Sequence, residues 1–529
     1  MNSFGNRRVD HTTVLVVGGG PAGLSAVAEL GLRGVDCVLL EPRVEVSHRR
    51  PRAKTTSVRT MEHFRRWGAA DALRAAAPLP VAWSQRVTFC ESLSGRRITS
   101  FDGVFGLTTQ RDERFAETGQ QVPQPIVEQV LRDHVARHGT VDLRLGHAAT
   151  TLEQDEDGVT AVARDDIGGE YEIRARYVLG CDGAGGVTRG QIGANYVGRS
   201  DPRPNCNIVF RAPSLDTWLG PAVQYWVVGA DTSGLVGRLD LAGTWWAVIP
   251  GIDAEHGAAH ASDLIEELVG AHIEHEVLQT DPWTARLLVA DRFQRGRVFL
   301  VGESAHVNPP WGGHGFNTCV GDAVNIAWKI AAVEQGCAPP DLLASYDVER
   351  RGVVEQTVAS AEANLRSLAN DLPRDEAAIQ RAKREEFHSL GLVLGYTYAD
   401  SPIVQRTDHS GVPIDVSEYQ PTTLPGSRLP HMWLPDGGSL YDRLGTGFAL
   451  VGPPHQHTSD LVRRAAARNI PLTLLTAPDT YPWHREFLLV RPDQHIAWRA
   501  DDPADIDLEQ VVGHAGSGFV AGSRAPAAR

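Results

Sequence analysis

The chain has 529 residues and an ordinary globular composition, with 42% hydrophobic, 22% charged and 7% aromatic residues. This length is enough for two or three domains, and the composition excludes a mainly disordered, collagen-like or coiled-coil protein. Fifty-one basic and 65 acidic residues give a net charge of −14, which argues against binding to nucleic acid or to an anionic membrane.

The six cysteines are irregularly spaced without any CxxC pair, so the sequence predicts reduced thiols rather than disulfides or a zinc site. No other metal site is predicted. Residues 1–11 lack the apolar core of a signal peptide. The apolar run 14–30 is interrupted by glycines and a proline, which favours a strand, a turn and a helix over a membrane span. We therefore expect a cytoplasmic protein.

The first predicted element is a β-strand over residues 13–17, which runs directly into the sequence Gly-Gly-Gly-Pro-Ala-Gly. A helix to about residue 33 and a second strand over 36–40 complete a βαβ unit. Glycines in the G-x-G-x-x-G positions permit a tight turn, an approach to a pyrophosphate and close helix packing, and an acid after the second strand can hold a ribose. The residues assigned to this dinucleotide site are Gly18, Gly20, Pro21, Ala22, Gly23 and Glu41.

Two later apolar strands also end in a glycine and an acid. The segment 177–181 ends in Asp182 and Gly183, and the segment 297–301 ends in Gly302 and Glu303. Because Asp-Gly is common in turns, a structural strand-end role for Asp182 stays an alternative. His306, which follows the second of these strands, is expected to be packed rather than catalytic. A glycine-rich loop over 309–317 then opens a helix over 318–332.

These motifs, in this order, resemble the class A flavin-dependent aromatic hydroxylases, the family of p-hydroxybenzoate, phenol and polyketide hydroxylases. The resemblance covers nearly the whole chain, and it includes P-x-x-G-x-G-x-N…DA-x-N-x-x-W-K over residues 310–329 and the segments 51–53, 59–62 and 124–128. It implies an α/β FAD-binding Rossmann-like domain with an inserted antiparallel β substrate domain and a C-terminal thioredoxin-like α/β domain. Two positions depart from the family: Glu303 stands where Asp is usual, and Gly186 where Ser is frequent.

The resemblance also implies contacts with FAD beyond the fingerprint. Arg52 and Gln124 would contact its ribityl and phosphate part, Ala149 would lie beside the adenine, and Pro309 would lie near the reacting edge of the flavin. The helix that begins near Asn317 would direct its positive end toward the flavin ring. The full set is Arg52, Gln124, Ala149, Asp182, Gly302, Glu303, Pro309, Gly313, Gly315, Phe316 and Asn317.

Between about residues 195 and 290, short alternating strands at 206–211, 224–228, 234–239 and 244–250 predict an antiparallel sheet, which by resemblance covers the substrate. Trp226, Trp245 and Trp246 are candidate substrate contacts, with core packing as the alternative for each. Arg238 is a candidate catalytic residue that would hold a phenolate or position the flavin. Candidate bases are His314, His48 and a residue of this sheet. The charges of the helix at 128–137 are expected to face solvent.

The predicted domains are an FAD-binding domain over 10–190 and 291–365, a substrate sheet over 191–290, a helical linker over 366–426, a thioredoxin-like domain over 427–515 and a disordered tail over 516–529. Strands at 448–452, 472–475, 487–491 and 496–499, with a helix at 460–468, predict the α/β C-terminal domain. Because no cysteine follows residue 337, disulfide exchange is excluded there. A role in stability, or in a homo-oligomer through this domain, is expected instead.

The residues and the resemblance together predict an FAD-dependent monooxygenase that uses NADPH or NADH and O₂ to hydroxylate an electron-rich aromatic ring through a flavin C4a-hydroperoxide. A phenol, a polyketide aromatic or a hydroxypyridine would suit, and the tryptophans favour a larger apolar ring. An epoxidase or Baeyer–Villiger oxygenase stays open, as does a non-catalytic flavoprotein or aromatic-ligand binding protein. A flavin-dependent halogenase is disfavoured, because Ala247 replaces a motif tryptophan and no lysine lies between Lys54 and Lys329.

Overall fold

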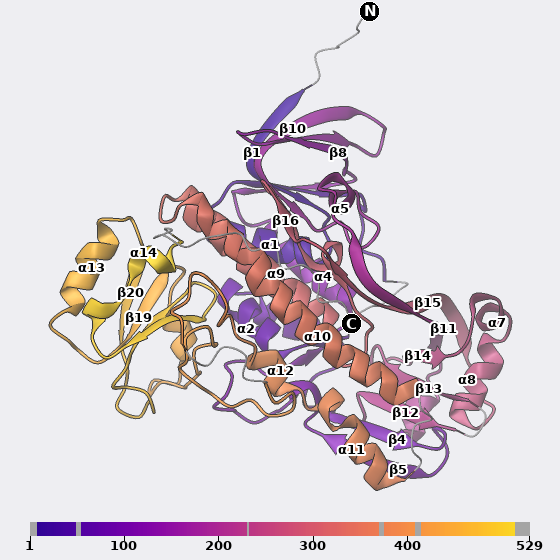
Figure 1. Ribbon diagram of the computed structural model, residues 1–529. Helices are drawn as coiled ribbons and strands as arrows, with labels where there is room; N and C mark the ends of the chain where they lie inside the picture. Colours follow the sequence, from indigo (N-terminus) through magenta and orange to yellow (C-terminus); the bar gives the residue numbers. More distant parts are fainter. Residues whose placement is uncertain (1–7, 49–53, 230–231, 370–374, 408–413, 514–529) are drawn as a thin grey trace, which may run out of the picture. The chain divides into compact units, whose positions relative to one another are not determined.

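The computed structural model describes residues 8–48, 54–229, 232–369, 375–407 and 414–513. Arg52 and the predicted disordered tail, 516–529, lie outside the described residues. The chain divides into two compact units, which are described separately (Figure 1). The first unit contains Met1–Ala327, Arg350–Gly395 and Ile414–Gln420, and the second contains Trp328–Glu349, Tyr396–Pro413 and Pro421–Arg529.

An eight-stranded sheet is the first layer of the first unit, with the order β16-β17-β10-β1-β2-β7 and the strands β8 and β9 joined to it through β10. The strands β17, β10, β1, β2 and β7 are parallel to one another. Parallel strands covered on both faces are continuous apolar runs, which explains why all of β2 and the second half of β1 are buried. The bounds are β1 (Val9–Val17), β2 (Cys37–Glu41), β7 (Val141–Leu145), β8 (Ala148–Gln154), β9 (Val159–Arg164), β10 (Glu170–Gly180), β16 (Gln294–Arg295) and β17 (Val298–Leu300).

Helices connect and cover these strands. The helix α1 joins β1 to β2 and packs against α4, and the long helices α9 and α10 run side by side (Figure 1). The short strands β3 (Thr55–Thr56) and β6 (Gln120–Gln121) pair with each other. The helices are α1 (Pro21–Leu32), α2 (Val58–Trp67), α3 (Ala70–Ala76), α4 (Gln124–Val135), α5 (Thr188–Gln191), α9 (Gly315–Glu334) and α10 (Ser345–Ala369), with short 3₁₀ turns η1 (Val104–Gly106), η2 (Gly302–Ser304) and η3 (Pro340–Ala344).

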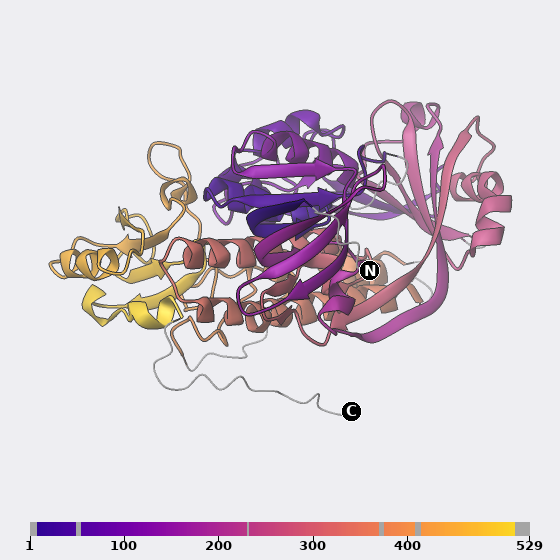
Figure 2. The same ribbon diagram turned by 90° about the horizontal axis from the view of Figure 1, so that it is seen from above.

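A second eight-stranded sheet of this unit has the order β18-β15-β11-β14-β13-β12-β4-β5. Its two longest strands, β11 and β15, pair along most of their length and sweep together toward the rest of the sheet (Figure 2). The sheet also recruits β4 and β5 from an earlier part of the chain, because β4 pairs in parallel with β12. The bounds are β4 (Arg86–Cys90), β5 (Arg97–Asp102), β11 (Tyr196–Arg211), β12 (Gln224–Val228), β13 (Ser233–Arg238), β14 (Thr244–Pro250), β15 (Glu276–Ala290) and β18 (His306–Val307).

The two faces of this second sheet have different partners. On one face Trp245 and Ala247 of β14 share an apolar cluster with Leu264 and Leu268 of α8. On the other face Trp226 of β12 shares a cluster with Phe387 of α11. Trp246 and Val248 of β14 pack against this second cluster, so alternate residues of β14 face different surroundings, as the pleat requires. The helices beside this sheet are α6 (Leu215–Trp218), α7 (Ala254–Ala259), α8 (Ala261–Val269), α11 (Glu376–Phe387) and α12 (Leu390–Leu394).

The second unit contains a four-stranded sheet of order β20-β19-β21-β22. The strands β19 and β20 are parallel and are joined through α13, whereas β21 and β22 are antiparallel to their neighbours. The strands lie where the apolar segments of the sequence predict them. The bounds are β19 (Phe448–Gly452), β20 (Leu472–Thr476), β21 (Phe487–Val490), β22 (Ile496–Ala500), α13 (Thr458–Ala466) and α14 (Leu508–Val511), with 3₁₀ turns η4 (Leu440–Arg443) and η5 (Pro503–Asp505).

A buried ion network lies in this second unit. The carboxylate of Glu349 pairs with the Lys329 ammonium at 2.7 Å and with both terminal nitrogens of Arg491 at 2.7 and 2.8 Å. Burial alone would raise the pKa of Glu349, but Arg491 and Lys329 outweigh it and bring the pKa to about 2. Lys329, which the sequence places at the end of the 310–329 motif, is therefore engaged by Glu349.

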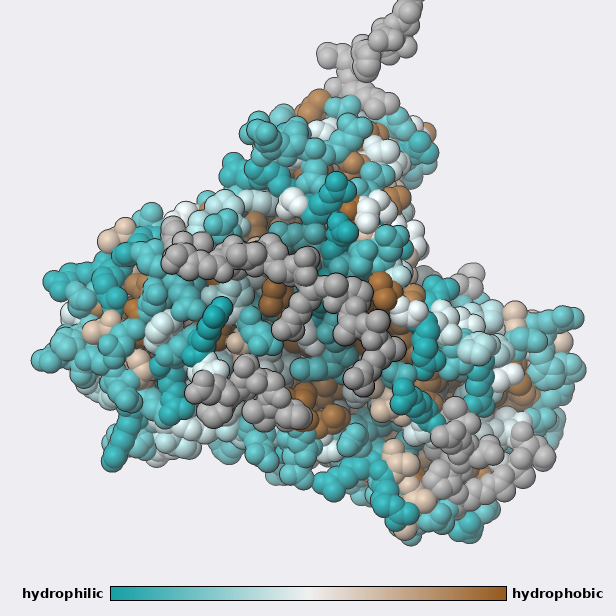
Figure 3. All heavy atoms as spheres, viewed as in Figure 1, coloured by the Kyte–Doolittle hydropathy of each residue, from teal (hydrophilic) through white to brown (hydrophobic). Residues whose placement is uncertain are grey.

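Hydrophilic residues predominate on the face seen in Figure 3, where hydrophobic residues are scattered rather than gathered. Large hydrophobic side chains that are exposed, such as Ile167 and Val197, come from separate places in the chain. Scattered exposed apolar residues are ordinary for a folded protein surface. Within the described ranges, the helices include none that combines the length and the apolar character of a membrane span.

Candidate active site

The glycine loop between β1 and α1 has a shape that requires glycine. Gly18 has a φ of +103°, and a Cβ there would lie 2.4 Å from the carbonyl oxygen of Cys181. A Cβ on Gly23 would lie 1.9 Å from the carbonyl oxygen of Gly18. At Gly20, by contrast, a Cβ would meet nothing within 4 Å, because this residue borders a cavity. Among the described residues no side chain caps α1, so its first N–H groups are left for an anion.

Glu41 ends β2 and borders the same cavity. One carboxylate oxygen accepts from the backbone N–H of Gly19 at 2.7 Å, and the other accepts from the backbone N–H of Arg43 at 2.9 Å. The Arg43 guanidinium also pairs with this carboxylate at 2.7 Å. A carboxylate has about four acceptor sites, so Glu41 is fixed beside the glycine loop with acceptor capacity left for a hydroxyl group.

The helix α4 is not the solvated surface helix that its charges predict. Glu128 is buried, borders the cavity and accepts from the side-chain amide of Gln124 at 2.6 Å. Arg43 reaches the same carboxylate at 3.2 Å. Arg132 is buried as well and donates to the carbonyl of Val44 at 2.9 Å. The prediction holds for Asp133 and Arg137, which are exposed, but it is wrong for Glu128 and Arg132. These two side chains contact the segment after β2, which the pattern of α4 alone does not reveal.

Asp182 follows β10 and borders the cavity, but its carboxylate is also engaged within the fold. One oxygen accepts from the backbone N–H and the hydroxyl of Thr188 at 2.8 and 2.6 Å, and Ser304 donates to the other oxygen at 2.9 Å. These bonds agree with the structural alternative for Asp182. Gly186 lies against the carboxylate, where a Cβ would be 2.0 Å from the carboxyl carbon. The glycine at this position, unlike serine, leaves room for that carboxylate.

The turn after β17 presents Glu303 to the cavity. Gly302 has a φ of +65°, and a Cβ there would lie 3.0 Å both from Cβ of Ala22 in α1 and from Sγ of Cys319 in α9. Gly302 itself does not border the cavity. It lets the turn pass between two helices, and the position of Glu303 depends on this close fit.

Asp322 of α9 stabilises this turn through a hydrogen bond to its backbone. Its carboxylate accepts from the Gly302 N–H at 3.2 Å and pairs with His306 and Arg350, each at 2.7 Å. Burial alone would raise the pKa of Asp322, but Arg350 and His306 outweigh it and hold the pKa below its usual value. His306 is fully packed in this network, as the sequence predicts.

The loop before α9 supplies a further part of the cavity wall. Its residues that border the cavity are Pro309, Pro310, Trp311, Gly312, Gly313, Gly315 and Phe316. Asn317 does not border it. Its side chain accepts from the Ser57 N–H at 2.9 Å and donates to the carbonyls of Thr55 and Gly313 at 3.1 and 2.7 Å. Asn317 therefore ties this loop to β3.

An apolar part of the wall comes from the second sheet and its surroundings, and it consists of Phe105, Ile208, Val209, Leu235, Trp246, Val248, Trp283, Ala285 and Trp311. Of the three tryptophans singled out from the sequence, Trp246 borders the cavity. Trp245 belongs to the α8 side of the sheet, and Trp226 is stacked on Phe89 with ring centroids 5.4 Å apart. Trp283 was not singled out from the sequence, because its segment lacks the alternation of its neighbours.

Arg238 does not border the cavity. It is buried, pairs with Asp216, and places its guanidinium 4.2 Å from the ring centroid of Trp245. Because Arg238 is the cross-strand partner of Trp245, both side chains lie on the α8 side of the sheet. Burial lowers the pKa of Arg238 to about 10, which still leaves it charged at neutral pH.

Lys54 borders the cavity, although no sequence pattern indicates it. Its ammonium donates to the carbonyl of Val223, just before β12, at 2.5 Å, and it lies 5.2 Å from the ring centroid of Trp246. Burial, and then the positive charge of Arg238, lower the pKa of Lys54 to about 7. The one feature of the sequence that distinguishes Lys54 is the small number of lysines, because it is one of three in the chain.

His314 is buried in the loop before α9 and does not border this cavity. Burial lowers its pKa to about 4, so its imidazole is neutral near pH 7 and a weak proton acceptor. We expect the pH profile of kcat/KM above about pH 5 to contain no ionisation from His314. His314→Asn would change the rate but keep every midpoint of that profile. Loss of a midpoint near neutral pH in this variant would contradict the assignment.

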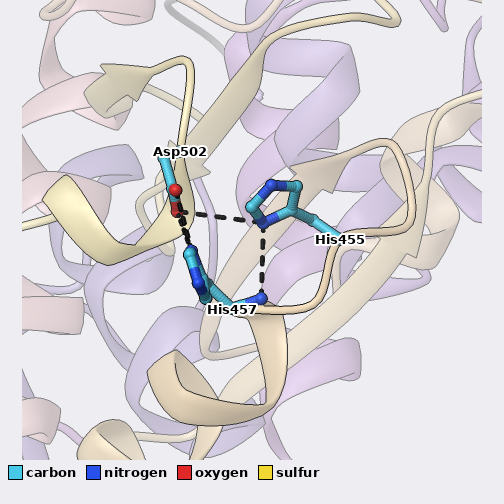
Figure 4. Close-up of side chains that lie close together, drawn as sticks. All are labelled: His455, His457 and Asp502. Atoms are coloured by element: carbon cyan, nitrogen blue, oxygen red, sulfur yellow. Dashed lines mark hydrogen bonds and ion pairs between the residues drawn. The ribbon is translucent and has the colours of Figure 1, made fainter.

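A cluster of potential metal-ligating side chains lies in the second unit, where His455, His457 and Asp502 point toward one another (Figure 4). The Nδ1 atom of His457 lies 2.8 Å from the Asp502 carboxylate, and the Nδ1 atom of His455 accepts from the backbone N–H of His457 at 3.3 Å. Asp502 also accepts from the backbone N–H of Ala504 at 2.8 Å. These bonds engage the side chains of all three residues without an ion, and they hold the turn before α13 to the turn at η5.

The wall segments of the first unit meet at one cavity of about 940 Å³. This volume is near the upper end of the roughly 300–1,000 Å³ usual for small-molecule sites. The polar part of the wall contains the glycine loop, Glu41, Gln124, Ala149, Asp182 and Glu303, and the apolar part contains the tryptophans. A helix N-terminus with uncapped N–H groups and an aromatic-lined hollow share one space, an arrangement typical of enzymes that bind a dinucleotide.

The chain belongs to the FAD-binding aromatic-ring hydroxylases. The FAD binding domain family matches residues 11–361, and the aromatic-ring hydroxylase C-terminal family matches residues 422–515. The protein is therefore a flavin-dependent monooxygenase of class A, with FAD as its cofactor and NAD(P)H as its reductant.

Two curated relatives are similar to it over nearly their whole length. The chain is 31% identical to 2,4-dichlorophenol 6-monooxygenase of Cupriavidus pinatubonensis, over 93% of this chain and 94% of the relative. It is also 31% identical to a putative polyketide hydroxylase of Streptomyces halstedii, over 95% of this chain and 96% of the relative.

Among solved structures, the rebeccamycin biosynthetic enzyme RebC with reduced flavin is 32% identical, with a TM-score of 0.86 over 96% of this chain and 100% of that chain. Aklavinone-11 hydroxylase in complex with FAD and aklavinone is 27% identical, with a TM-score of 0.83 over 95% of this chain and 99% of that chain. Both neighbours share the arrangement of a sheet-rich FAD-binding region and a C-terminal domain.

Proposed function

We propose that this protein hydroxylates a flat, largely apolar aromatic compound of more than one ring, with FAD, NAD(P)H and O₂. The observation that carries the proposal is the single cavity whose wall contains both the glycine loop and Trp246, Trp283 and Trp311. Aromatic walls favour a planar ring by stacking, and an extended ring system would use more of this surface. The relatives named for polyketides and for aklavinone support a substrate of this size.

The residues present fit FAD. The open space beside Gly20 and the uncapped end of α1 suit a pyrophosphate. Because glycine has no side chain, a phosphate group could approach the backbone closely at this position. Glu41 would accept from a ribose hydroxyl, and Gln124, Asp182 and Glu303 would contact the ribityl chain and the phosphates. Ala149 would lie beside the adenine. Pro309, Gly313, Gly315 and Phe316 would lie along the flavin ring, and Gly23, Gly302 and Asn317 would act by holding the neighbouring backbone in place.

When bound, FAD supplies hydride acceptance from NAD(P)H and the activation of O₂. The chain itself would position the cofactor and the substrate, and it would exclude water from the site. The N-terminal end of α9 begins at Gly315 in the cavity wall, so its dipole would stabilise negative charge developing on the ring system. The apolar side chains of the second sheet would exclude water from the space in which the flavin and the substrate react. Trp246 would stack on the substrate.

We also infer a domain organisation from these elements, with the FAD-binding domain over 10–190 and 291–365 and the substrate sheet over 191–290. The strands β4 and β5 lie within 10–190 in the sequence but belong to the substrate sheet. A helical linker over 366–426 and a thioredoxin-like domain over 427–515 would complete it. The βαβ arrangement of β19, α13 and β20, followed by an antiparallel pair, supports the thioredoxin-like assignment. A domain of this kind without cysteines would serve stability or contact between subunits.

The proposal is tested with the FAD-loaded protein and a graded series of hydroxylated aromatics with one, two and three fused rings. NADPH consumption in air is measured for each compound, and the masses of the products are determined by mass spectrometry. We expect multi-ring compounds to accelerate NADPH loss most and to gain one oxygen atom each. Faster turnover of the single-ring phenols would contradict the proposed substrate size. NADPH loss without any oxygenated product would favour a non-catalytic flavoprotein or an aromatic-ligand binding protein instead.

A further inference from the structure

Lys54 occupies the point at which the loop before α9 meets the second sheet. It directly precedes Thr55 of β3, whose carbonyl accepts from Asn317, and a Cβ on Gly313 would lie 3.3 Å from the Thr55 side chain. From there the Lys54 side chain reaches the carbonyl of Val223 at 2.5 Å, at the start of β12. A group bound to this ammonium would therefore lie between the flavin-side loop and the tryptophan wall.

The ammonium of Lys54 has no acidic partner. Within the part of the chain that the structure describes, no carboxylate lies within 4.0 Å of its Nζ atom, and its charged neighbour Arg238 has the same sign. Burial and Arg238 together lower the pKa of Lys54 to about 7. An ammonium has three N–H donors, and the Val223 carbonyl accepts one of them. A partly buried cation without an acidic partner is costly unless a ligand supplies the missing negative charge.

The contrast with Lys383 shows that this arrangement is not general in the chain. Lys383 is fully buried, but it pairs with Glu386 at 2.7 Å, and its Nζ atom lies 4.4 Å from the ring centroid of Trp226. Glu386 borders the cavity, but Lys383 already neutralises its charge. The other charged residues of the cavity wall are Glu41, Arg43, Glu128, Asp182, Asp281, Arg286 and Glu303.

We propose that Lys54 is the base that takes the proton of a ring hydroxyl of the substrate and then holds the resulting phenolate. This inference rests on the proposed function, because it assigns a role within the same cavity. The proton moves from the hydroxyl oxygen to the neutral amine of Lys54, which becomes an ammonium paired with the phenolate. No other reactant is needed, and the net charge of the pair is unchanged.

The step has a chemical purpose. An ionised oxygen releases electron density into its ring, which makes the ring a better target for an electrophilic oxygen. Trp246, whose ring centroid lies 5.2 Å from the Lys54 Nζ atom, would hold the plane of the substrate while Lys54 fixes the direction of its oxygen. A neutral amine in the free enzyme accepts the proton, and the ion pair then stabilises the charged form.

The test uses the FAD-loaded protein with two probes, 2-hydroxyanthraquinone and anthraquinone, which differ by one ionisable hydroxyl. We compare wild type with Lys54→Met, which keeps the length of the side chain without its charge, and with Lys54→Arg, whose guanidinium keeps the positive charge but stays protonated and so cannot accept the proton. We expect Lys54→Met to bind 2-hydroxyanthraquinone about ten- to a hundredfold more weakly and anthraquinone unchanged. The visible colour of the bound hydroxyanthraquinone should report a lower hydroxyl pKa in wild type than in Lys54→Met.

The two variants distinguish the two proposed roles of Lys54, which are to accept the proton and to hold the phenolate. We expect Lys54→Arg to recover much of the affinity for the ionised probe, and we expect kcat/KM of wild type to rise with pH through about 7 as Lys54 loses its proton. Lys54→Met should lack this rise. Equal binding of both probes by wild type and Lys54→Met, with equal hydroxyl pKa values, would overturn the role of Lys54. If oxygen transfer to the probe persists in that case, the proposed function stands without it.

Discussion

Gly20→Val is expected to leave the protein folded and to weaken its affinity for FAD by about a hundredfold, a loss of about 3 kcal/mol from backbone hydrogen bonds that are no longer made. A Cβ at Gly20 meets nothing within 4 Å, and its φ of −75° suits any residue, so the added side chain causes no clash within the protein. It would instead occupy the space that a pyrophosphate needs beside α1. The measurements are thermal unfolding without FAD and FAD binding followed by flavin fluorescence.

The matched control is Gly23→Val, three residues further along the same loop. Its Cβ would lie 1.9 Å from the carbonyl oxygen of Gly18, so this variant must disturb the packing of α1 on β1 even without a cofactor. We expect its unfolding temperature to fall in the FAD-free protein, unlike that of Gly20→Val. If Gly20→Val binds FAD as tightly as wild type, the pyrophosphate does not lie at this loop.

The second large effect is expected for Asp322→Ala, which should lower the free energy of unfolding by about 3–5 kcal/mol. The substitution removes the carboxylate that pairs with the buried guanidinium of Arg350 at 2.7 Å and that accepts from the N–H of Gly302. The turn that presents Glu303 would lose its brace, so FAD affinity should fall as well. Denaturant unfolding of the FAD-free protein measures the first effect, and flavin fluorescence measures the second.

An exposed pair of the same length is the control for Asp322→Ala. Asp102 pairs with Arg86 at 2.7 Å, but both side chains are largely exposed, so Asp102→Ala should cost less than about 1 kcal/mol. The pKa of Asp322 lies below its usual value, so its stabilising contribution is complete at neutral pH and disappears as the pH falls through that lowered pKa. Equal losses in the two variants would show that the Asp322 network does not stabilise the fold.

The sequence is sufficient for those parts of the fold that depend on local chemistry. The glycine loop is predictable because Gly18 and Gly23 occupy positions where the backbone excludes a side chain. The strands of the C-terminal sheet are predictable because each is a short apolar run between turn residues. The four short strands of the second sheet are recognisable by alternation in the same way. These features require no knowledge of a distant partner.

The remaining features depend on contacts between distant segments. The strand β4 joins the second sheet through its pairing with β12, more than a hundred residues later in the chain, and no local pattern indicates this. Glu128 is buried because Arg43 and Gln124 pair with it. Alternation predicts that neighbouring tryptophans face opposite sides, but not which of Trp245 and Trp246 borders the cavity. Lys54 has no motif at all, and its position is defined by the Val223 carbonyl.

The central claim is that the cavity brings FAD and a hydroxylated aromatic ring together for oxygen transfer from O₂. The most direct measurement is the mass of the product formed by the FAD-loaded protein with NADPH, ¹⁸O₂ and 2-hydroxyanthraquinone. We expect a product that carries one heavy oxygen atom on the ring, with none taken from water. A product with oxygen from water, or NADPH consumption that yields only peroxide with this compound and with every other member of the ring-size series, would contradict it.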